Sequence, residues 1–428
     1  MKKFILFRYL VAGICIFAFL TLASCGYQNP IPVDGQKTGS VVDSNTESAL
    51  VAILDDNANN TDTHSLSSEF PQTIQVRGGK PNQLCVLSLK LDVSKVTFQR
   101  TKKLSILVDD PSDKNGNRVG AKVISDDSKN IILKRVLMLN DIGELNCLLK
   151  IGNSDDVSGK YNLLAVEVNP IEEDLEYCIY ESENSSIRAV FCKSDISETG
   201  VSEKHIQENI EMLSSLRKSL KSFVYEQEPF NGVSTYICTE EMQMTGLAGN
   251  PIYINREDVP YLLNTISTDY NKPLRKDYFI TVFCHEMSHT FDGINSEKIK
   301  SNYNFDKEFF AILKEIYALT MAGYSLDDEF LTVKPSLDSG IYNYEVFLDS
   351  ILKRLELPQN KKNWQSIKET MHSINNVDLE YSEMEAFEAF IEILSEKSGV
   401  DLKSSFSDKA WKTLCNQYNK PKLDYLDD

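Results

Sequence analysis

One helical segment, residues 276–293 with the sequence KDYFITVFCHEMSHTFDG, sets the first requirement on the fold. Its apolar residues lie almost all round the predicted helix, and a helix of that kind is buried. Pro273 stands where such a helix begins and Gly293 where it ends, in agreement with common start and stop signals. The rest of the chain must therefore cover this helix on nearly every side.

Two histidines in this segment have the spacing of metal ligands. His285 and His289 are four residues apart, so both imidazoles project from one face of the helix and can share a metal ion. Glu286 follows the first histidine and can take a proton from water beside that metal. Since buried histidines need polar partners, the HExxH pattern predicts one Zn²⁺ ion, held by the two histidines, with Glu286 as the general base.

A third protein ligand must complete such a site. The pattern HExxHxxGxxH is excluded, because Asp292 stands in place of its glycine and Asn295 in place of its last histidine. The remaining large class takes a glutamate from a later helix. Glu308, which follows His289 after eighteen residues, and Glu388, much further along the chain, both qualify.

The sequence HEMSHTFD, followed much later by Tyr381, Glu388 and Glu392, resembles the catalytic domain of the anthrax lethal factor family. That family carries an HExxHxxD helix and a late EFFAE-type helix. The resemblance covers about residues 200–400, and its specific part is the HExxHxxD segment. It implies a zinc peptidase with Glu388 as the third ligand and Tyr381 as the phenol that stabilises the tetrahedral intermediate. It also implies that Asp292 orients a ligand histidine.

The second motif departs from the family pattern, and the third ligand stays open between three residues. Ala389 stands where the family has an aromatic residue, and Glu385 lies on the same helix face as Glu388. The separation of Glu388 from His289, 388 − 289 = 99 residues, is long, and an inserted helical segment at about 326–371 would explain it. Glu388 is the first choice, ahead of Glu308 and Glu385.

The pattern of apolar residues changes near residue 200, from short strand-like runs to helical spacing. This change predicts an α+β fold of two domains. Residues 73–195 contain short β-branched and apolar runs separated by turn signals, which are typical of a β-rich, sandwich-like domain. Residues 200–428 form the zincin-like domain with a large helical lobe. The apolar positions of its first helix recur at steps of three and four residues: Ile206, Ile210, Leu213, Leu216 and Leu220.

The N-terminus has the features of a bacterial lipoprotein signal peptide. Basic residues precede an apolar run from Tyr9 to Leu22, which is too short for a confident membrane span. The run ends in Leu-Ala-Ser-Cys, and residues 1–24 would be removed to leave Cys25 lipidated. Acyl chains on Cys25 would hold the protein in the cell envelope, facing outside the cytoplasm. Residues 25–72, rich in small polar residues, are expected to form a flexible tether.

Charge and cysteine content restrict the partners and the metal sites that this chain can have. With 45 basic and 63 acidic residues the formal charge is −18, so nucleic-acid binding is disfavoured. The cysteines show no CxxC spacing, so a thiolate zinc site is not expected. Cys178 and Cys192 lie in neighbouring strand-like runs and are the first pair to check for a disulfide, although buried free thiols suit them equally well. Nothing indicates an oligomeric state.

These features together predict a membrane-anchored zinc endopeptidase that acts on peptide or protein substrates outside the cytoplasm. An exposed strand near the metal would pair with an extended peptide, and residues 235–239 or 251–255 are candidates, unless both are interior strands. The alternative is a non-catalytic surface-binding lipoprotein with a relic zincin domain. A zinc enzyme acting on a non-peptide amide is a third possibility.

Overall fold

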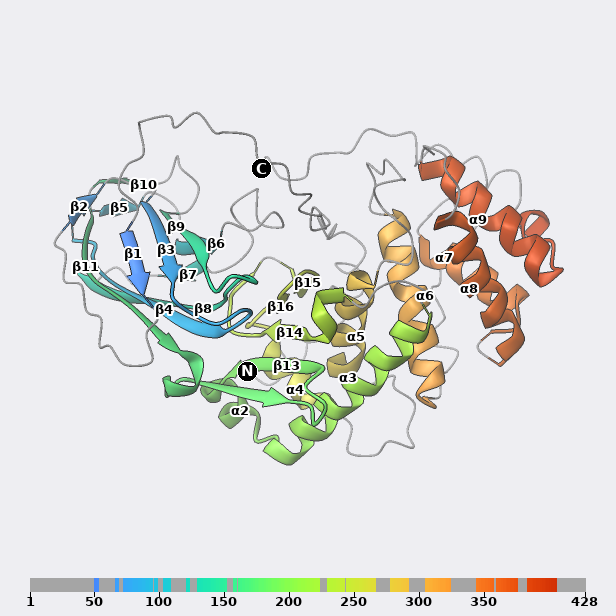
Figure 1. Cartoon of the computed structure of the whole chain (residues 1–428), viewed down its shortest axis with the longest axis horizontal. Coiled ribbons are helices and arrows are strands. Elements are labelled where there is room, and N and C mark those ends of the chain that lie inside the picture. Colours follow the sequence, from blue (N-terminus) through green and yellow to red (C-terminus); the bar gives the residue numbers. More distant parts are fainter. Residues whose placement is uncertain are drawn as a thin grey trace, which may run out of the picture.

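The computed structural model describes residues 50–53, 66–68, 72–94, 96–98, 103–108, 121–123, 129–151, 157–159, 161–223, 229–242, 244–266, 278–291, 305–324, 344–357, 359–375 and 383–405. Within these ranges the chain is α+β, with strands gathered toward one end and helices toward the other (Figure 1). No helix of these ranges combines the length and apolar character needed to cross a membrane. The expected signal peptide lies outside them.

The N-terminal half consists of β-sheets. One sheet has the order β1-β3-β9-β6-β7 and a second has the order β2-β11-β4-β8, while β5 and β10 form a two-stranded ribbon. All pairings are antiparallel except β1 with β3. The strands are β1 (Leu50–Ile53), β2 (Leu66–Ser68), β3 (Gln72–Arg77), β4 (Leu84–Asp92), β5 (Val96–Phe98), β6 (Lys103–Val108), β7 (Ala121–Val123), β8 (Asn130–Met138), β9 (Leu145–Ile151), β10 (Val157–Gly159) and β11 (Tyr161–Pro170).

A shared core joins the two larger sheets face to face. Ile74 and Val76 of β3 and Cys147 of β9 pack against residues of β4 and β8, such as Leu87 and Leu133. The predicted sandwich-like packing is therefore present. We call residues 50–170 the β-module. It begins earlier than expected, because β1 and β2 lie inside the range 25–72 and pair with β3 and β11, so those short stretches are not tether.

A third sheet belongs to the part of the described chain that follows residue 170, which we call the second half. Its order is β12-β13-β14-β16-β15, and it mixes parallel and antiparallel pairs. β12 and β13 precede the predicted domain boundary at residues 195–200, yet β13 pairs with β14 beyond it. The periodicity of a strand does not tell which sheet the strand joins, and the division into domains stays a prediction. The strands are β12 (Tyr177–Glu181), β13 (Ile187–Cys192), β14 (Ser234–Ile237), β15 (Gly246–Leu247) and β16 (Ile252–Ile254).

Helices make up the rest of the described second half. The expected amphipathic helix is α3, and all five of its predicted core positions are fully buried. The helical insertion expected near 326–371 contains α7 and α8. The helices are α2 (Lys193–Thr199), α3 (Glu203–Phe223), α4 (Val259–Asn264), α5 (Tyr278–Thr290), α6 (Phe305–Met321), α7 (Tyr344–Arg354), α8 (Lys361–Asn375), α9 (Glu383–Ser398) and the short 3-10 turns η2 (Ile171–Glu173), η3 (Pro229–Gly232) and η6 (Lys403–Ser405).

The third sheet is covered on both faces, and alternate side chains serve different cores. Phe191, Tyr236 and Ile252 belong to the core shared with the helices. Val190 and Ile237, their neighbours, belong to a core shared with β4 and β8 of the β-module. Because successive side chains of a strand point to opposite faces, this sheet is the middle layer between the helices and the β-module.

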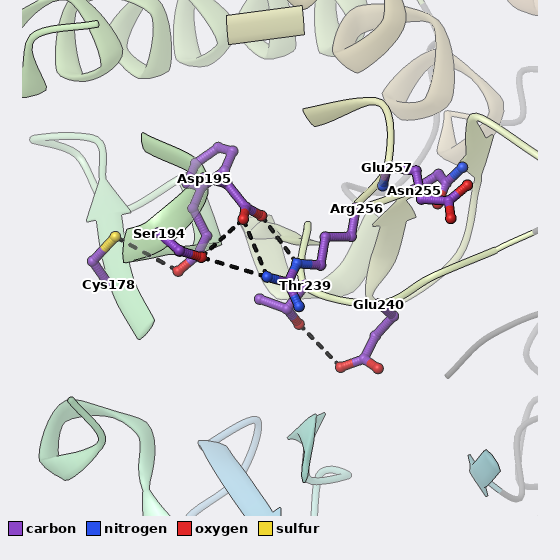
Figure 2. Close-up of polar contacts among 9 residues, drawn as sticks. Cys178, Ser194, Asp195, Thr239, Glu240, Asn255, Arg256 and Glu257 are labelled. Carbon is purple, nitrogen blue, oxygen red and sulfur yellow. Dashed lines mark hydrogen bonds and ion pairs between the residues drawn. The ribbon is translucent and has the colours of Figure 1, made fainter. Parts of the chain in front are cut away.

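Polar contacts accompany the apolar packing between the halves. Glu240, just after β14, accepts a hydrogen bond at 3.1 Å from the backbone N–H of Val136 in β8 and another at 3.0 Å from Thr239. Figure 2 shows Glu240 beside Thr239, and Arg256 extending to Asp195 on α2. The β-module is therefore fixed to the second half by both kinds of contact.

Cys178 and Cys192, the first pair to check for a disulfide, are both free thiols. The register explains why: Cys178 lies opposite Phe191, whereas Cys192 lies opposite Tyr177. The two thiols therefore point to opposite faces of the sheet. Burial raises the pKa of Cys178 to about 11 and that of Cys192 to about 12, so neither thiol is a reactive thiolate at neutral pH.

Candidate metal centre

Helix α5 carries the HExxH segment and lies against the third sheet. Phe279 and Phe283 stack at a centroid distance of 4.1 Å and contact Phe191 of β13. From β14, the hydroxyl of Tyr236 donates a hydrogen bond of 2.8 Å to the carbonyl of Phe283. The predicted buried helix is confirmed, and its middle is fixed to the sheet by both aromatic packing and a buried hydrogen bond.

Two cations fix the C-terminal end of the helix. The buried ammonium of Lys314 on α6 donates a hydrogen bond to the carbonyl of Phe291, just after α5. The guanidinium of Arg217 on α3 lies 5.2 Å from the centre of the Phe291 ring. Positive groups stabilise the carbonyl end of a helix, so these contacts hold the turn that follows His289.

The two histidines face each other. Their Nε2 atoms are 3.1 Å apart and their rings are nearly perpendicular, with an interplanar angle of 86°. Two nitrogens bound tetrahedrally to one Zn²⁺ at roughly 2.0–2.1 Å lie about 3.4 Å apart, close to the observed separation. A hydrogen bond between the rings also suits 3.1 Å. The pair thus fits a shared metal ion and is satisfied by an internal contact when none is bound.

A buried carboxylate orients the first histidine. Oε2 of Glu315, on α6, lies 3.3 Å from Nδ1 of His285, and the exposed fractions of the two side chains are 6% and 12%. A proton on Nδ1 directed at this carboxylate leaves Nε2 with its lone pair toward His289. Carboxylates commonly hold metal-binding histidines in this way, so Glu315 fixes both the tautomer and the ring.

Glu286 is buried beside the pair, with 3% of its surface exposed. It points toward the third sheet: its carboxylate lies against the backbone of Gly246 in β15. The three residues expected to carry the chemistry thus lie on one helix turn, between the sheet and α6.

The structure does not bring the predicted third ligand to the histidines. Glu388 lies half-buried on α9, and no group of three or more His, Cys, Asp or Glu side chains with metal-binding geometry occurs among the residues that the structure describes. Helix α9 meets α6 where Phe390 packs edge-on against Phe309 and Phe310. Glu308 and Glu385 belong to α6 and α9, with side chains outside the described set. The third ligand therefore stays a prediction.

Three further predicted residues fall outside the described ranges. These are Asp292, two residues after α5, Tyr381, two residues before α9, and Cys25 of the lipidation motif. Their roles stay predictions as well.

Both strands considered for peptide binding are interior. Residues 235–237 lie in β14 and residues 252–254 lie in β16, each with a strand on either side. The edge strands of this sheet are β12 and β15, and β15, Gly246–Leu247, lies against α5. Its two residues gave no strand signal in the sequence.

Glu315 is the site residue that the sequence reading missed. A signal was present: Glu315 and Lys314 interrupt an otherwise apolar stretch from Phe309 to Leu319, and both are buried. Ionised side chains are costly in such surroundings unless paired, so a charged residue inside an apolar helix indicates a specific partner.

Comparisons with known proteins leave the family open. No family model and no curated protein matches this chain. A crystal structure of a functionally unknown conserved protein from Bacillus anthracis str. Ames is similar over 81% of this chain and 73% of its own, with 12% identity and a TM-score of 0.42. A structure of the M60 catalytic domain with CBM51 domains from Clostridium perfringens ZmpB covers 80% of this chain and 40% of its own, with 10% identity and a TM-score of 0.34. At these scores the likenesses establish neither family nor activity.

Proposed function

We propose that this chain is a zinc-dependent peptidase whose metal is held by His285 and His289. The observation that carries the proposal is the pair of Nε2 atoms facing each other at 3.1 Å, with Glu286 buried on the same helix turn. The contact of Glu315 with Nδ1 of His285 adds support, since it orients a ligand nitrogen rather than competing for the metal.

The residues of this site divide the work of hydrolysis. When bound, Zn²⁺ would polarise the substrate carbonyl and lower the pKa of a water molecule to about 7. Glu286 would take a proton from that water and return it to the nitrogen of the leaving amine. The phenol of Tyr381 would donate a hydrogen bond to the oxyanion. Glu315 would accept the hydrogen on Nδ1 of His285, so that Nε2 presents its lone pair to the metal.

An extended peptide is the substrate class that the sheet favours. The edge strand β15 lies directly against α5, so a peptide that pairs with this edge would pass beside Glu286. Main-chain hydrogen bonds would then orient the scissile carbonyl.

The decisive test measures metal and hydrolysis together. We expect about one zinc per full chain by elemental analysis and chelator-sensitive cleavage of fluorescein-labelled β-casein. Glu286→Gln should keep the zinc and lose about 10²–10⁴-fold in kcat. A metal-free, well-folded parent would favour the non-catalytic surface-binding lipoprotein. A zinc-loaded parent that cleaves only small amides would favour a zinc enzyme that acts on a non-peptide amide.

A variant series identifies the third ligand. Alanine at the residue that binds the metal, Glu388, Glu308 or Glu385, should abolish zinc binding, while alanine at the other two leaves it intact. Glu315→Gln provides the contrast. Because Glu315 acts through His285, its variant should weaken zinc binding about 10–100-fold without abolishing it.

We also propose lipid anchoring at Cys25 and location outside the cytoplasm. The motif Leu22-Ala23-Ser24-Cys25 after an apolar run supports it. Fractionation of cells producing the full chain should place it in the membrane fraction, and Cys25→Ser should prevent labelling by a radioactive fatty acid. An unlabelled parent would contradict the proposal.

A further inference from the structure

We propose that Gly246 is a positioning residue: the space left by its missing side chain holds the carboxylate of Glu286. The inference deepens the proposed function and rests on it, because it concerns how the general base is placed. It names a residue outside the HExxH helix that the reaction requires.

The argument begins with the distances at Gly246. A Cβ atom added there would lie 2.3 Å from Oε1 of Glu286, 2.5 Å from its Cδ and 2.6 Å from its Cγ. Non-bonded heavy atoms attract best at roughly 3.5–4.0 Å, so all three separations are deep overlaps. The side chain of Glu286 therefore occupies the volume that any other residue at position 246 would need.

Backbone conformation does not explain the glycine. Gly246 is absent from the residues with positive φ, and it pairs in ordinary antiparallel register with Ile254. Other residue types adopt this conformation without strain. Glycine is therefore required at this position because any side chain would overlap that of Glu286.

The strand cannot easily retreat from a larger side chain. Leu247, the next residue, points to the opposite face and is 1% exposed in the core shared with Val136 and Tyr253. The helix is fixed as well, since the hydroxyl of Tyr236 donates a hydrogen bond to the carbonyl of Phe283, about one turn before Glu286. With strand and helix both held, an added methyl group would displace the carboxylate itself.

Displacement of this carboxylate separates two properties of the site. The three atoms nearest to a Cβ at position 246 all belong to Glu286, whereas His285 and His289 contact each other, so metal binding should survive Gly246→Ala. Proton transfer should not survive, because a general base must lie within hydrogen-bond reach of the proton that it removes.

A double-mutant cycle tests the contact without metal or substrate. In the full chain, Gly246→Ala should lower the Tm by about 2–6 °C, as overpacking does. In a Glu286→Ala background the volume is vacant, and the same substitution should leave the Tm unchanged or raise it slightly. Gly249→Ala is the matched control: its Cβ would meet only the carbonyl of Pro251 at 3.2 Å, so its effect should be equal in both backgrounds.

Kinetics test the positioning. With labelled β-casein, Gly246→Ala should lose about 100-fold or more in kcat while KM and zinc content stay at parent values, and Gly249→Ala should behave like the parent. An equal loss of Tm in both backgrounds, or a fall in zinc content that parallels activity, overturns the inference. A parent that binds zinc but cleaves no casein counts against the proposed function. In that case the double-mutant cycle still tests whether Gly246 makes room for Glu286.

Discussion

The two faces of the third sheet differ in what covers them. On one face, α3, α4 and α5 pack against side chains such as Phe191 and Tyr236, and the pair of His285 and His289 lies in this layer. On the other face, β4 and β8 of the β-module pack against Ile237 and Tyr253, with Arg135 and Glu240 buried among them. The proposed metal site is on the helical face, while the opposite face holds the β-module.

This difference teaches that the β-module is part of the support for the site. The edge strand β15 contributes Leu247 to the module face and Gly246 to the helical face. A change in how the β-module packs would therefore reach Glu286 through a single strand. The module is therefore structurally coupled to the site through β15.

Removal of the β-module should have the largest effect. A chain beginning at Ile171 would expose the apolar side chains that the module covers, including Val190 and Ile237. Exposed apolar patches of this kind favour aggregation or a loosely packed state. We expect the fragment to lose cooperative unfolding in calorimetry; a cooperative transition at the parent temperature would show that the helical face suffices.

Arg135→Ala should cost the next largest amount. The guanidinium is 1% exposed, lies 5.8 Å from the centre of the Tyr253 ring and lowers the cost of ionising Glu240. Loss of one member of a buried charge pair costs about 3–5 kcal/mol in the free energy of unfolding, which urea titration would measure. Adding Glu240→Gln should recover part of the lost free energy of unfolding. If it recovered none, the charges of Arg135 and Glu240 would not interact.

Tyr236→Phe probes the helical face. It removes the buried hydroxyl that donates to the carbonyl of Phe283 and leaves that carbonyl without this bond. The expected loss is about 1–3 kcal/mol in the free energy of unfolding. Hydrogen exchange should show the loss at α5 rather than in the β-module; a change confined to the module would contradict the separation of the two faces.

Glu240→Gln should give the smallest and most pH-dependent effect. Burial raises the pKa of Glu240 above its ordinary value of 4.5, with Arg135 opposing the shift. The folded state then holds the proton more tightly than the unfolded state. The stabilising contribution of the group is complete below about pH 4.5 and is lost as the pH rises through the folded-state pKa.

The glutamine variant lacks this titration while keeping an acceptor for the N–H of Val136. The unfolding free energy of the variant relative to that of the parent should therefore rise as the pH increases from 4.5 through the folded-state pKa of Glu240. Urea titrations of both proteins across this range measure the difference. A pH-independent difference would show that Glu240 does not titrate between the folded and unfolded states.

The sequence predicted the elements better than their assembly. Periodicity located α3 because its apolar positions recur at helical spacing, whereas start and stop signals located α5. Spacing alone paired His285 with His289. Periodicity could not assign β12 and β13 to a sheet, since a strand buried on both faces lacks alternation and says nothing of its partners. The separation of Cys178 from Cys192 likewise depends on a register that the sequence does not contain.

The carboxylates around the histidines show the same limit. Glu315 is 315 − 289 = 26 residues beyond His289, and only the packing of α6 against α5 brings it to His285. Gly246 was equally invisible, because the reason for its glycine is a side chain forty residues away in the sequence, at Glu286. Motif spacing predicts contacts within a helix and does not reach those that tertiary packing creates.

The alternation along β14 also limits how this protein can vary in length. Tyr236 faces the helices and Ile237 faces the β-module, so the loss or gain of one residue before them would exchange the two. The phenol of Tyr236 would then leave the helical face, and the carbonyl of Phe283 would lose its donor. We therefore expect this strand to accept changes of residue type far more readily than insertions or deletions.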